Sequence, residues 1–196
     1  MSERSIGESP LANVRLPAGV EGGGDTADVV SHERALLGHI NLRGNPHDRA
    51  FAAAVETAIG IALPVVPNTI SDANGITAYW LGPEEWLIVT PADREAAIAH
   101  ALRMAVDGMF AAVTEVSGGQ TIVVLRGPAA REILAKGCPL DLHPRVFGPG
   151  QCAQSRLARA PILVRQTDAS PTFEIIVRRS FAEYLWLWLQ DAAVYR

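Results

Sequence analysis

Two cysteines and a histidine lie within one short segment of the chain, at Cys138, His143 and Cys152. A thiol beside an imidazole can act as a nucleophile, and both groups can bind a metal. A zinc site needs four ligands and usually contains a closely spaced pair, which this segment lacks. Cys138 also precedes Pro139 at the end of an expected helix, where a small apolar side chain commonly fills a gap. Packing is the favoured interpretation, and a thiol-based redox or metal protein stays open as an alternative.

The other polar residues show no spacing that predicts catalysis. The five histidines do not show the four-residue helical spacing that is typical of metal ligands. They are His32, His39, His47, His100 and His143. Glu84 and Glu85 follow Gly-Pro in an expected turn, and Asp141 is expected to stabilise a turn or cap a helix. Residues 22–24 are three glycines, but no strand precedes them and a phosphate-binding loop has different spacing. The sequence therefore predicts no catalytic, cofactor-binding or metal residue in this chain.

Composition is typical of a globular protein rather than of a disordered one. Hydrophobic residues make up 48% of the 196 residues and charged residues 19%. The formal net charge of −4 disfavours nucleic acid as a partner, because nucleic-acid binders carry a cationic surface. No hydrophobic segment is long enough to span a bilayer, and the first residues do not resemble a signal peptide. We expect a cytoplasmic protein with no membrane partner.

A weak internal repeat indicates how the elements are arranged. Residues 39–44 and 121–127 are expected strands, and each ends in Leu-Arg-Gly and is followed by proline and a helix. A second pair of strands, at 86–89 and 174–177, also precedes helices, expected at 93–104 and 181–192. Helices this short need a sheet to cover. The repeat predicts an α+β fold with mostly antiparallel sheets and helices packed on one face.

The repeat divides the chain into an arm and two related sub-domains. Residues 1–34 contain few large apolar side chains and are expected to form an irregular N-terminal arm. The first sub-domain is expected over residues 35–113 and the second over residues 114–196. Three strands between two helices make the second sub-domain ferredoxin-like, with strands expected at 152–157 and 161–167.

The last helix carries more large apolar side chains than one face can hold. Its expected core stripe consists of Phe181, Tyr184, Leu185, Trp188, Leu189 and Ala192. Trp186 and Leu187 fall outside this stripe, on either side of a polar line. A monomer rarely exposes tryptophan, so either another segment of this chain covers Trp186 or a partner does. We expect Trp186 and Leu187 to form a partner interface.

Several longer segments resemble the gamma subunit of heterotetrameric bacterial sarcosine oxidase. In the second half they are residues 136–144 (KGCPLDLHP), 150–154 (GQCAQ), 157–161 (LARAP) and 178–186 (RRSFAEYLW). In the first half, residues 63–64, 67–69 and 80–87 (WLGPEEWL) are of the same kind. The resemblance covers about residues 36–193, and the arm lies outside it.

This resemblance implies a fold similar to the domains of the glycine cleavage T-protein and a place in an oxidoreductase complex. Such a complex demethylates sarcosine to glycine with oxygen, forms hydrogen peroxide and transfers the one-carbon unit to tetrahydrofolate. The resemblance implies that the alpha, beta and delta subunits, chiefly the large one, are partners and hold FAD, FMN, NAD, tetrahydrofolate and zinc. This chain is then a non-catalytic assembly subunit. A stand-alone folate-binding one-carbon transferase is the alternative.

Overall fold

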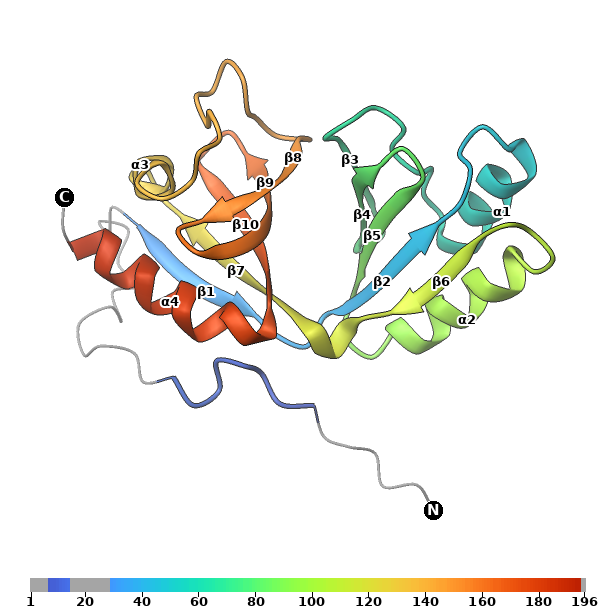
Figure 1. Ribbon diagram of the computed structural model, residues 1–196, viewed down its shortest axis with the longest axis horizontal. Coiled ribbons are helices and arrows are strands. Elements are labelled where there is room, and N and C mark those ends of the chain that lie inside the picture. Colours follow the sequence, from blue (N-terminus) through green and yellow to red (C-terminus); the bar gives the residue numbers. More distant parts are fainter. Residues whose placement is uncertain (1–6, 15–28, 195–196) are drawn as a thin grey trace.

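The computed structural model describes residues 7–14 and 29–194. In these ranges the helices are α1 (Arg49–Ile59), α2 (Glu95–Ala105), α3 (Ala130–Ala135) and α4 (Arg179–Val194), with a 3₁₀ turn, η1 (Ser117–Gly119). The strands are β1 (Val30–Arg34), β2 (Gly38–Arg43), β3 (Ile70–Ala73), β4 (Ile76–Gly82), β5 (Glu85–Thr90), β6 (Ala112–Glu115), β7 (Gln120–Arg126), β8 (Cys152–Leu157), β9 (Ala160–Asp168) and β10 (Thr172–Arg178). They form two antiparallel sheets with helices on their outer faces (Figure 1). The α+β fold is confirmed.

The first sheet has the strand order β3-β4-β5-β2-β6. The succession β2-α1-β4-β5-α2-β6 is a ferredoxin-like βαββαβ unit, to which β3 adds an edge strand. Asp48 starts α1 by accepting a hydrogen bond from the Ala50 amide at 2.9 Å, and Gly60 ends the helix with a φ of 75°. The first half is thus as ferredoxin-like as the second was expected to be.

The second sheet has the order β1-β7-β10-β9-β8, in which β1 comes from a distant part of the chain. Residues 30–34, expected to be part of an irregular arm, form β1, and Val30 pairs with Arg126 of β7. This edge strand has a largely exposed, polar sequence, so hydrophobic alternation does not reveal it. The expected boundary after residue 113 falls inside β6, which pairs with β2 of the first sheet.

The expected repeat is present in the structure. Strands β2 and β7 occupy matching positions next to an edge strand, and each pairs with the central strand of its own sheet, β5 or β10. The helices match in the same way, because α1 and α3 follow β2 and β7, and α2 and α4 follow β5 and β10. Both halves therefore use one plan, and β1 takes in the second half the place that β6 takes in the first.

Three hydrophobic clusters hold the layers together. One cluster packs α1 and α2 on the first sheet, and another packs α3 and α4 on the second. The third lies between the two sheets and consists of Tyr79, Leu87, Val89, Ile122, Cys152, Leu163 and Ile176. The central strands are therefore buried on both faces, which explains their continuous apolar runs. We call the contact between the two inner faces the seam.

Candidate functional site

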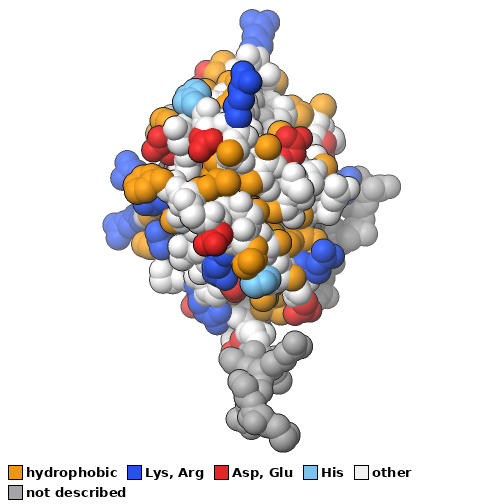
Figure 2. Space-filling model, turned by 90° about the vertical axis from the view of Figure 1, so that its right-hand side faces the viewer, with side chains coloured by type: hydrophobic (Ala, Val, Ile, Leu, Met, Phe, Trp, Pro, Cys, Tyr) orange, Lys and Arg blue, Asp and Glu red, His pale blue; other side chains and the backbone are white. Residues whose placement is uncertain are grey.

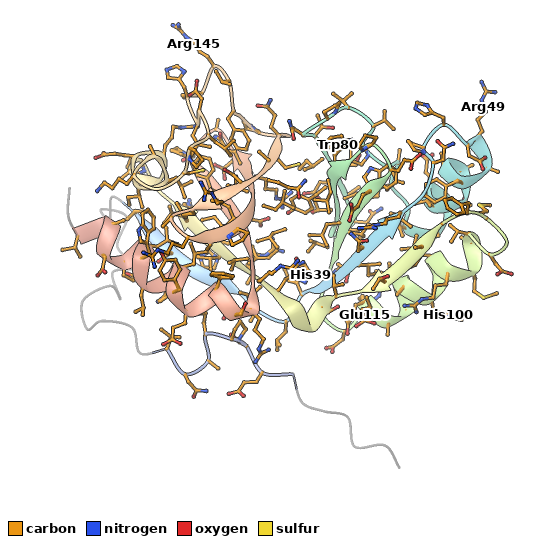
Figure 3. All side chains as sticks on the ribbon, viewed as in Figure 1. His39, Arg49, Trp80, His100, Glu115 and Arg145 are labelled. Carbon is orange, nitrogen blue, oxygen red and sulfur yellow. The ribbon has the colours of Figure 1, made fainter. Side chains whose placement is uncertain are left out.

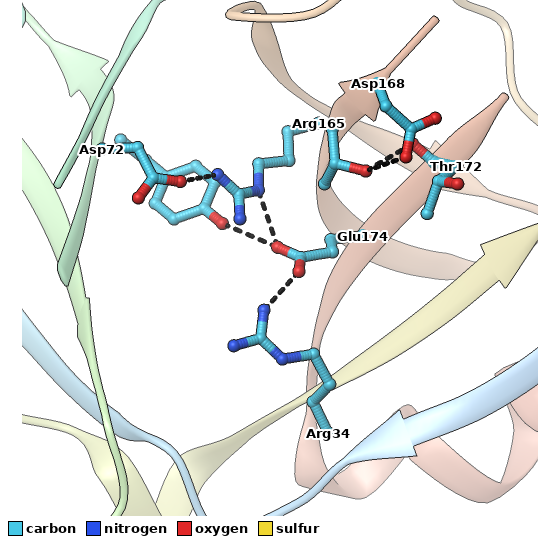
Figure 4. A network of polar contacts seen from close by, with 8 residues as sticks. Arg34, Asp72, Arg165, Asp168, Thr172 and Glu174 are labelled. Carbon is cyan, nitrogen blue, oxygen red and sulfur yellow. Dashed lines mark hydrogen bonds and ion pairs between the residues drawn. The ribbon is translucent and has the colours of Figure 1, made fainter. Parts of the chain in front are cut away.

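A buried ion pair lies at the centre of the seam. Glu174 of β10 accepts a hydrogen bond from Arg165 Nε of β9 at 2.6 Å, and their side chains are 6% and 8% exposed. The second carboxylate oxygen of Glu174 pairs with Nη1 of Arg34 on β1. These contacts join three strands of the second sheet, β1, β9 and β10, around one carboxylate (Figure 4).

The same charges reach across the seam to the first sheet. Arg165 donates from Nη1 to Asp72 of β3 at 2.8 Å, and its guanidinium lies 5.5 Å from the ring centroid of Tyr79. The Tyr79 hydroxyl donates to Glu174 at 3.3 Å. We call Arg34, Asp72, Tyr79, Arg165 and Glu174 the seam network. Because its members come from both sheets, it fixes the two halves relative to each other.

The surroundings of these groups fix their charge states. Burial raises the pKa of Glu174, but the hydrogen bonds and charges of Arg165 and Arg34 outweigh burial and hold that pKa below its ordinary value. Burial raises the pKa of Tyr79 far above its ordinary value, despite the opposing charge of Arg165. Glu174 thus stays ionised and Tyr79 stays neutral near pH 7. The seam network acts as a fixed clamp rather than as a proton donor or acceptor.

An open groove of about 880 Å³ lies beside the seam, between the inner faces of the two sheets. Its polar lining includes Asn41, Glu85, Thr114, Ser117, Gln120 and Gln154. Glu85 accepts hydrogen bonds from Asn41 at 2.8 Å and from Arg43 at 2.9 Å, so that its charge is neutralised within the groove. The lining residues offer amides and hydroxyls for hydrogen bonding and contain neither a thiol nor an imidazole.

The two cysteines are buried in different clusters and do not meet His143. The thiol of Cys138 lies in the core of the second half and donates to Ser155 at 3.7 Å. The thiol of Cys152 lies at the seam, where burial raises its pKa to about 11. His143 is exposed, and its Nδ1 accepts a hydrogen bond from the Arg145 amide at 3.2 Å. Both thiols pack in the core, as favoured from the sequence, and the structure does not bring the alternative nucleophile or metal cluster together.

The segment around His143 is a loop that Arg131 holds in place. Arg131 of α3 donates to the carbonyl oxygens of Leu142 and Phe147, and it donates to Gln166 at 2.9 Å. The Asp141 carboxylate accepts from the His143 amide at 2.9 Å, which confirms its expected role in a turn. This explains the 136–144 segment in structural terms, because its polar groups stabilise the loop itself.

The remaining histidines are dispersed, as their spacing indicated. His39 is buried between the two halves, and His100 lies on α2 at the surface (Figure 3). Burial lowers the pKa of His39 to about 4, although a hydrogen bond to the Leu37 carbonyl at 3.0 Å opposes this shift. Within residues 7–14 and 29–194, no three side chains of metal-ligand type come together. The glycines at 22–24 lie outside the described residues.

The structure places the expected interface residues of α4 differently. Trp186 is 5% exposed and belongs to the core of the second half, so another part of this chain covers it. It cannot anchor a partner in this position. Leu187 is 44% exposed and remains available at the surface. The buried stripe of α4 is rotated toward Ala182, Trp186 and Gln190, because the Gln190 amide is buried and donates to Ser31 of β1 at 2.8 Å.

The seam network itself was not expected from the sequence, although a signal exists. Arg165 and Glu174 interrupt strands that are otherwise apolar and buried, at 162–164 and 175–177. A charge in such a position must be paired, because an isolated buried charge is strongly unfavourable. The pairing partners on β1 and β3 could not be assigned without the topology.

Comparisons with known proteins agree on one family. The sequence matches the sarcosine oxidase gamma subunit family over residues 43–195. It is 35% identical over 171 residues to sarcosine oxidase subunit gamma of Corynebacterium sp. (strain P-1), covering 86% of this chain and 82% of that one. The corresponding subunit of Arthrobacter sp. is 33% identical over 189 residues, covering 96% of this chain and 90% of that one.

Comparison with solved structures supports the same family. Heterotetrameric sarcosine oxidase from Corynebacterium sp. U-96, in complex with pyrrole 2-carboxylate, contains a chain that matches with a TM-score of 0.84 at 32% identity. The match covers 95% of this chain and 94% of that one. Glycine cleavage system aminomethyltransferase T from Bartonella henselae matches with a TM-score of 0.63 at 17% identity, covering 85% of this chain and 47% of that one. The likeness to the aminomethyltransferase shows a shared fold.

Within the described ranges, no helix has the length and apolarity needed to cross a bilayer.

Proposed function

This chain belongs to the sarcosine oxidase gamma subunit family, and we propose that it serves as a non-catalytic subunit of a heterotetrameric sarcosine oxidase. One observation carries the proposal: nearly the whole chain superimposes on nearly the whole of a chain in such a heterotetramer. The complex would demethylate sarcosine to glycine, form hydrogen peroxide and pass the one-carbon unit to tetrahydrofolate. The comparisons do not favour a stand-alone folate-dependent transferase.

The proposed role of this chain is to supply a rigid surface. The seam network links both sheets, and β1 extends the second sheet from the start of the chain. Both features favour a body that keeps its shape when it binds. We propose the alpha, beta and delta subunits as partners, chiefly the large one, and the cytoplasm as the location. FAD, FMN, NAD, tetrahydrofolate and zinc would be held by those other subunits.

Co-purification tests the assignment. The full chain with an affinity tag is expressed together with the other subunits, and the recovered species are identified by mass. We expect a complex of fixed stoichiometry that oxidises sarcosine, whereas the purified chain alone consumes no oxygen with sarcosine. Recovery of the chain without companions, or sarcosine oxidation by the chain alone, contradicts the proposal.

A second measurement tests whether this chain helps to enclose the reaction path inside the complex. If the chain helps to enclose the path between flavin and folate, it limits the escape of formaldehyde into solvent. The complex without this chain is then expected to release more free formaldehyde when tetrahydrofolate is present. Equal release from both complexes removes the enclosing role and leaves the assembly role in place.

A further inference from the structure

A loop at the outer end of the first half exposes an aromatic side chain completely. Residues 107–111 connect α2 to β6, and Phe110 in this loop is 102% exposed. Met104, at the end of α2, is 64% exposed. Figure 2 views the molecule from this end and shows hydrophobic side chains across its middle with charged side chains around them. Aromatic residues are enriched at protein interfaces and often dominate binding.

The backbone holds this loop in one conformation. The Met109 amide donates to the Val106 carbonyl at 3.0 Å, and the Ala111 amide donates to the Met109 carbonyl at 2.9 Å. Gly108 has a φ of 74°, which allows the tight turn. Met109 and Ala111 pack against the core of the first half, so the neighbours of Phe110 are anchored. The ring is thus presented by a preorganised support, which lowers the entropy lost on binding.

A pocket of about 830 Å³ adjoins Phe110 and could receive a side chain. Phe51, Pro83, Met109 and Phe110 supply apolar walls. The rim carries the carboxylates of Asp48, Glu84 and Glu85 and one guanidinium, that of Arg43. We call this the anchor pocket. An apolar floor with charges at its edge is the usual anatomy of an interface site.

The charges at the rim indicate what enters the anchor pocket. Arg43 pairs with Glu85 at 2.9 Å, which leaves the charges of Asp48 and Glu84 in excess. Asp48 caps α1, and among the described residues no ion pair or side-chain hydrogen bond involves Glu84. A basic group is therefore favoured beside the pocket. A second copy docked through the same surface would bring two acidic rims together, which is unfavourable.

We propose that Phe110 and the anchor pocket form the contact through which this chain docks on a neighbouring subunit of the oxidase. The partner segment has an apolar side chain that enters the pocket beside Phe110 and a lysine or arginine next to it that faces Glu84. This inference rests on the proposed function and specifies one surface for it. The exposed Leu187 of α4 lies in the other half and is not part of this contact.

The test measures the affinity of the full chain for the complex of the other subunits. Phe110→Ser is expected to weaken binding roughly 30-fold, the loss typical of a central aromatic contact. Val146→Ser is the matched control, because Val146 is also an exposed apolar residue but lies between α3 and β8 in the other half and does not line the anchor pocket. Circular dichroism and thermal unfolding are expected to be unchanged, since an exposed ring adds little to the fold.

The contribution of the Glu84 carboxylate to binding is tested separately. Glu84→Gln is expected to weaken binding about threefold at low salt, and high salt removes this difference because it screens rim charges. Glu132→Gln, on α3 in the other half, is the matched control for losing one exposed carboxylate. A loss of affinity for Glu84→Gln at low salt that disappears at high salt supports the proposed basic neighbour. Equal effects of Glu84→Gln and Glu132→Gln overturn it.

Three results distinguish the possibilities. If wild type binds the other subunits and Phe110→Ser binds equally well, the docking inference is wrong and the proposed function stands. If wild type does not bind them at all, the proposed function fails. If the isolated chain sediments as a dimer and Phe110→Ser makes it monomeric, the occupant is a second copy, which also overturns the inference.

Discussion

Replacing Glu174 with glutamine removes the negative charge from the centre of the seam network. Two guanidinium groups converge on this carboxylate, and Arg165 is 8% exposed on its side chain. In Glu174→Gln, the amide group places N–H donors against these donors, and Arg165 keeps only Asp72 as an anionic partner. Breaking one side of a buried ion pair lowers stability by about 3–5 kcal/mol. This is a large part of the roughly 5–15 kcal/mol that stabilises a typical domain.

Urea unfolding of the full chain, followed by tryptophan fluorescence, measures the effect on the free energy of unfolding. Glu85→Gln is the control, because it breaks the Arg43–Glu85 pair, whose side chains are 62% and 32% exposed. An exposed pair contributes only about 0–1 kcal/mol. If Glu174→Gln lowers stability no more than Glu85→Gln does, the seam network does not clamp the halves and the reasoning is refuted.

The pH dependence gives an independent check on the same residue. The folded-state pKa of Glu174 lies below its ordinary value, so its stabilising effect is complete above the unfolded pKa. That effect is lost as the pH falls through the folded pKa. The stability difference between wild type and Glu174→Gln should therefore be constant from pH 6 to 8 and shrink in acid. A difference that grows in acid contradicts the assigned charge state.

Three further predictions concern other positions in the fold. The pKa of His39 is lowered from 6.5 to about 4, so wild type should lose about 3 kcal/mol of stability as the pH falls through this window, and His39→Gln should flatten that loss in pH-dependent urea unfolding. In Gly137→Ala, the new Cβ would lie 2.6 Å from Trp188 Cζ2, so overpacking should lower the melting temperature by several degrees, with a stability loss of about 1–3 kcal/mol. Cys138 and Cys152 are buried, so a thiol-reactive dye at pH 7.5 should label them only as fast as the chain unfolds, and rapid labelling of folded protein would contradict their packing.

The sequence predicts those parts of the fold that depend on local pattern. Leu-Arg closes both β2 and β7 and is followed by glycine and then proline, and this recurrence indicates the repeat because it marks the same strand-to-helix turn twice. Strand β1 escapes the same analysis because it is a polar edge strand, held by backbone pairing rather than by a hydrophobic face.

The candidate site is less accessible to sequence analysis, because its contacts join distant segments. Arg165 and Glu174 can be suspected as a pair, since each interrupts a buried apolar strand. Their link to Asp72 needs the packing of one sheet on the other. Trp186 was misplaced for a related reason: Gln190 is buried against β1, and this rotates the buried face of α4 away from the purely apolar stripe.

The position of β1 has a consequence for how the polypeptide can be divided. A cut between the halves would separate the edge strand at residues 30–34 from the β7 neighbour it pairs with at residues 122–126. The carboxy-terminal fragment would then lack a strand, and the amino-terminal fragment would carry one with unpaired peptide groups. During synthesis β1 leaves the ribosome before β7, so its pairing with β7 can form only after β7 has been made. Because β1 completes the sheet of the second half, we expect both halves to be needed in one chain for a stable fold.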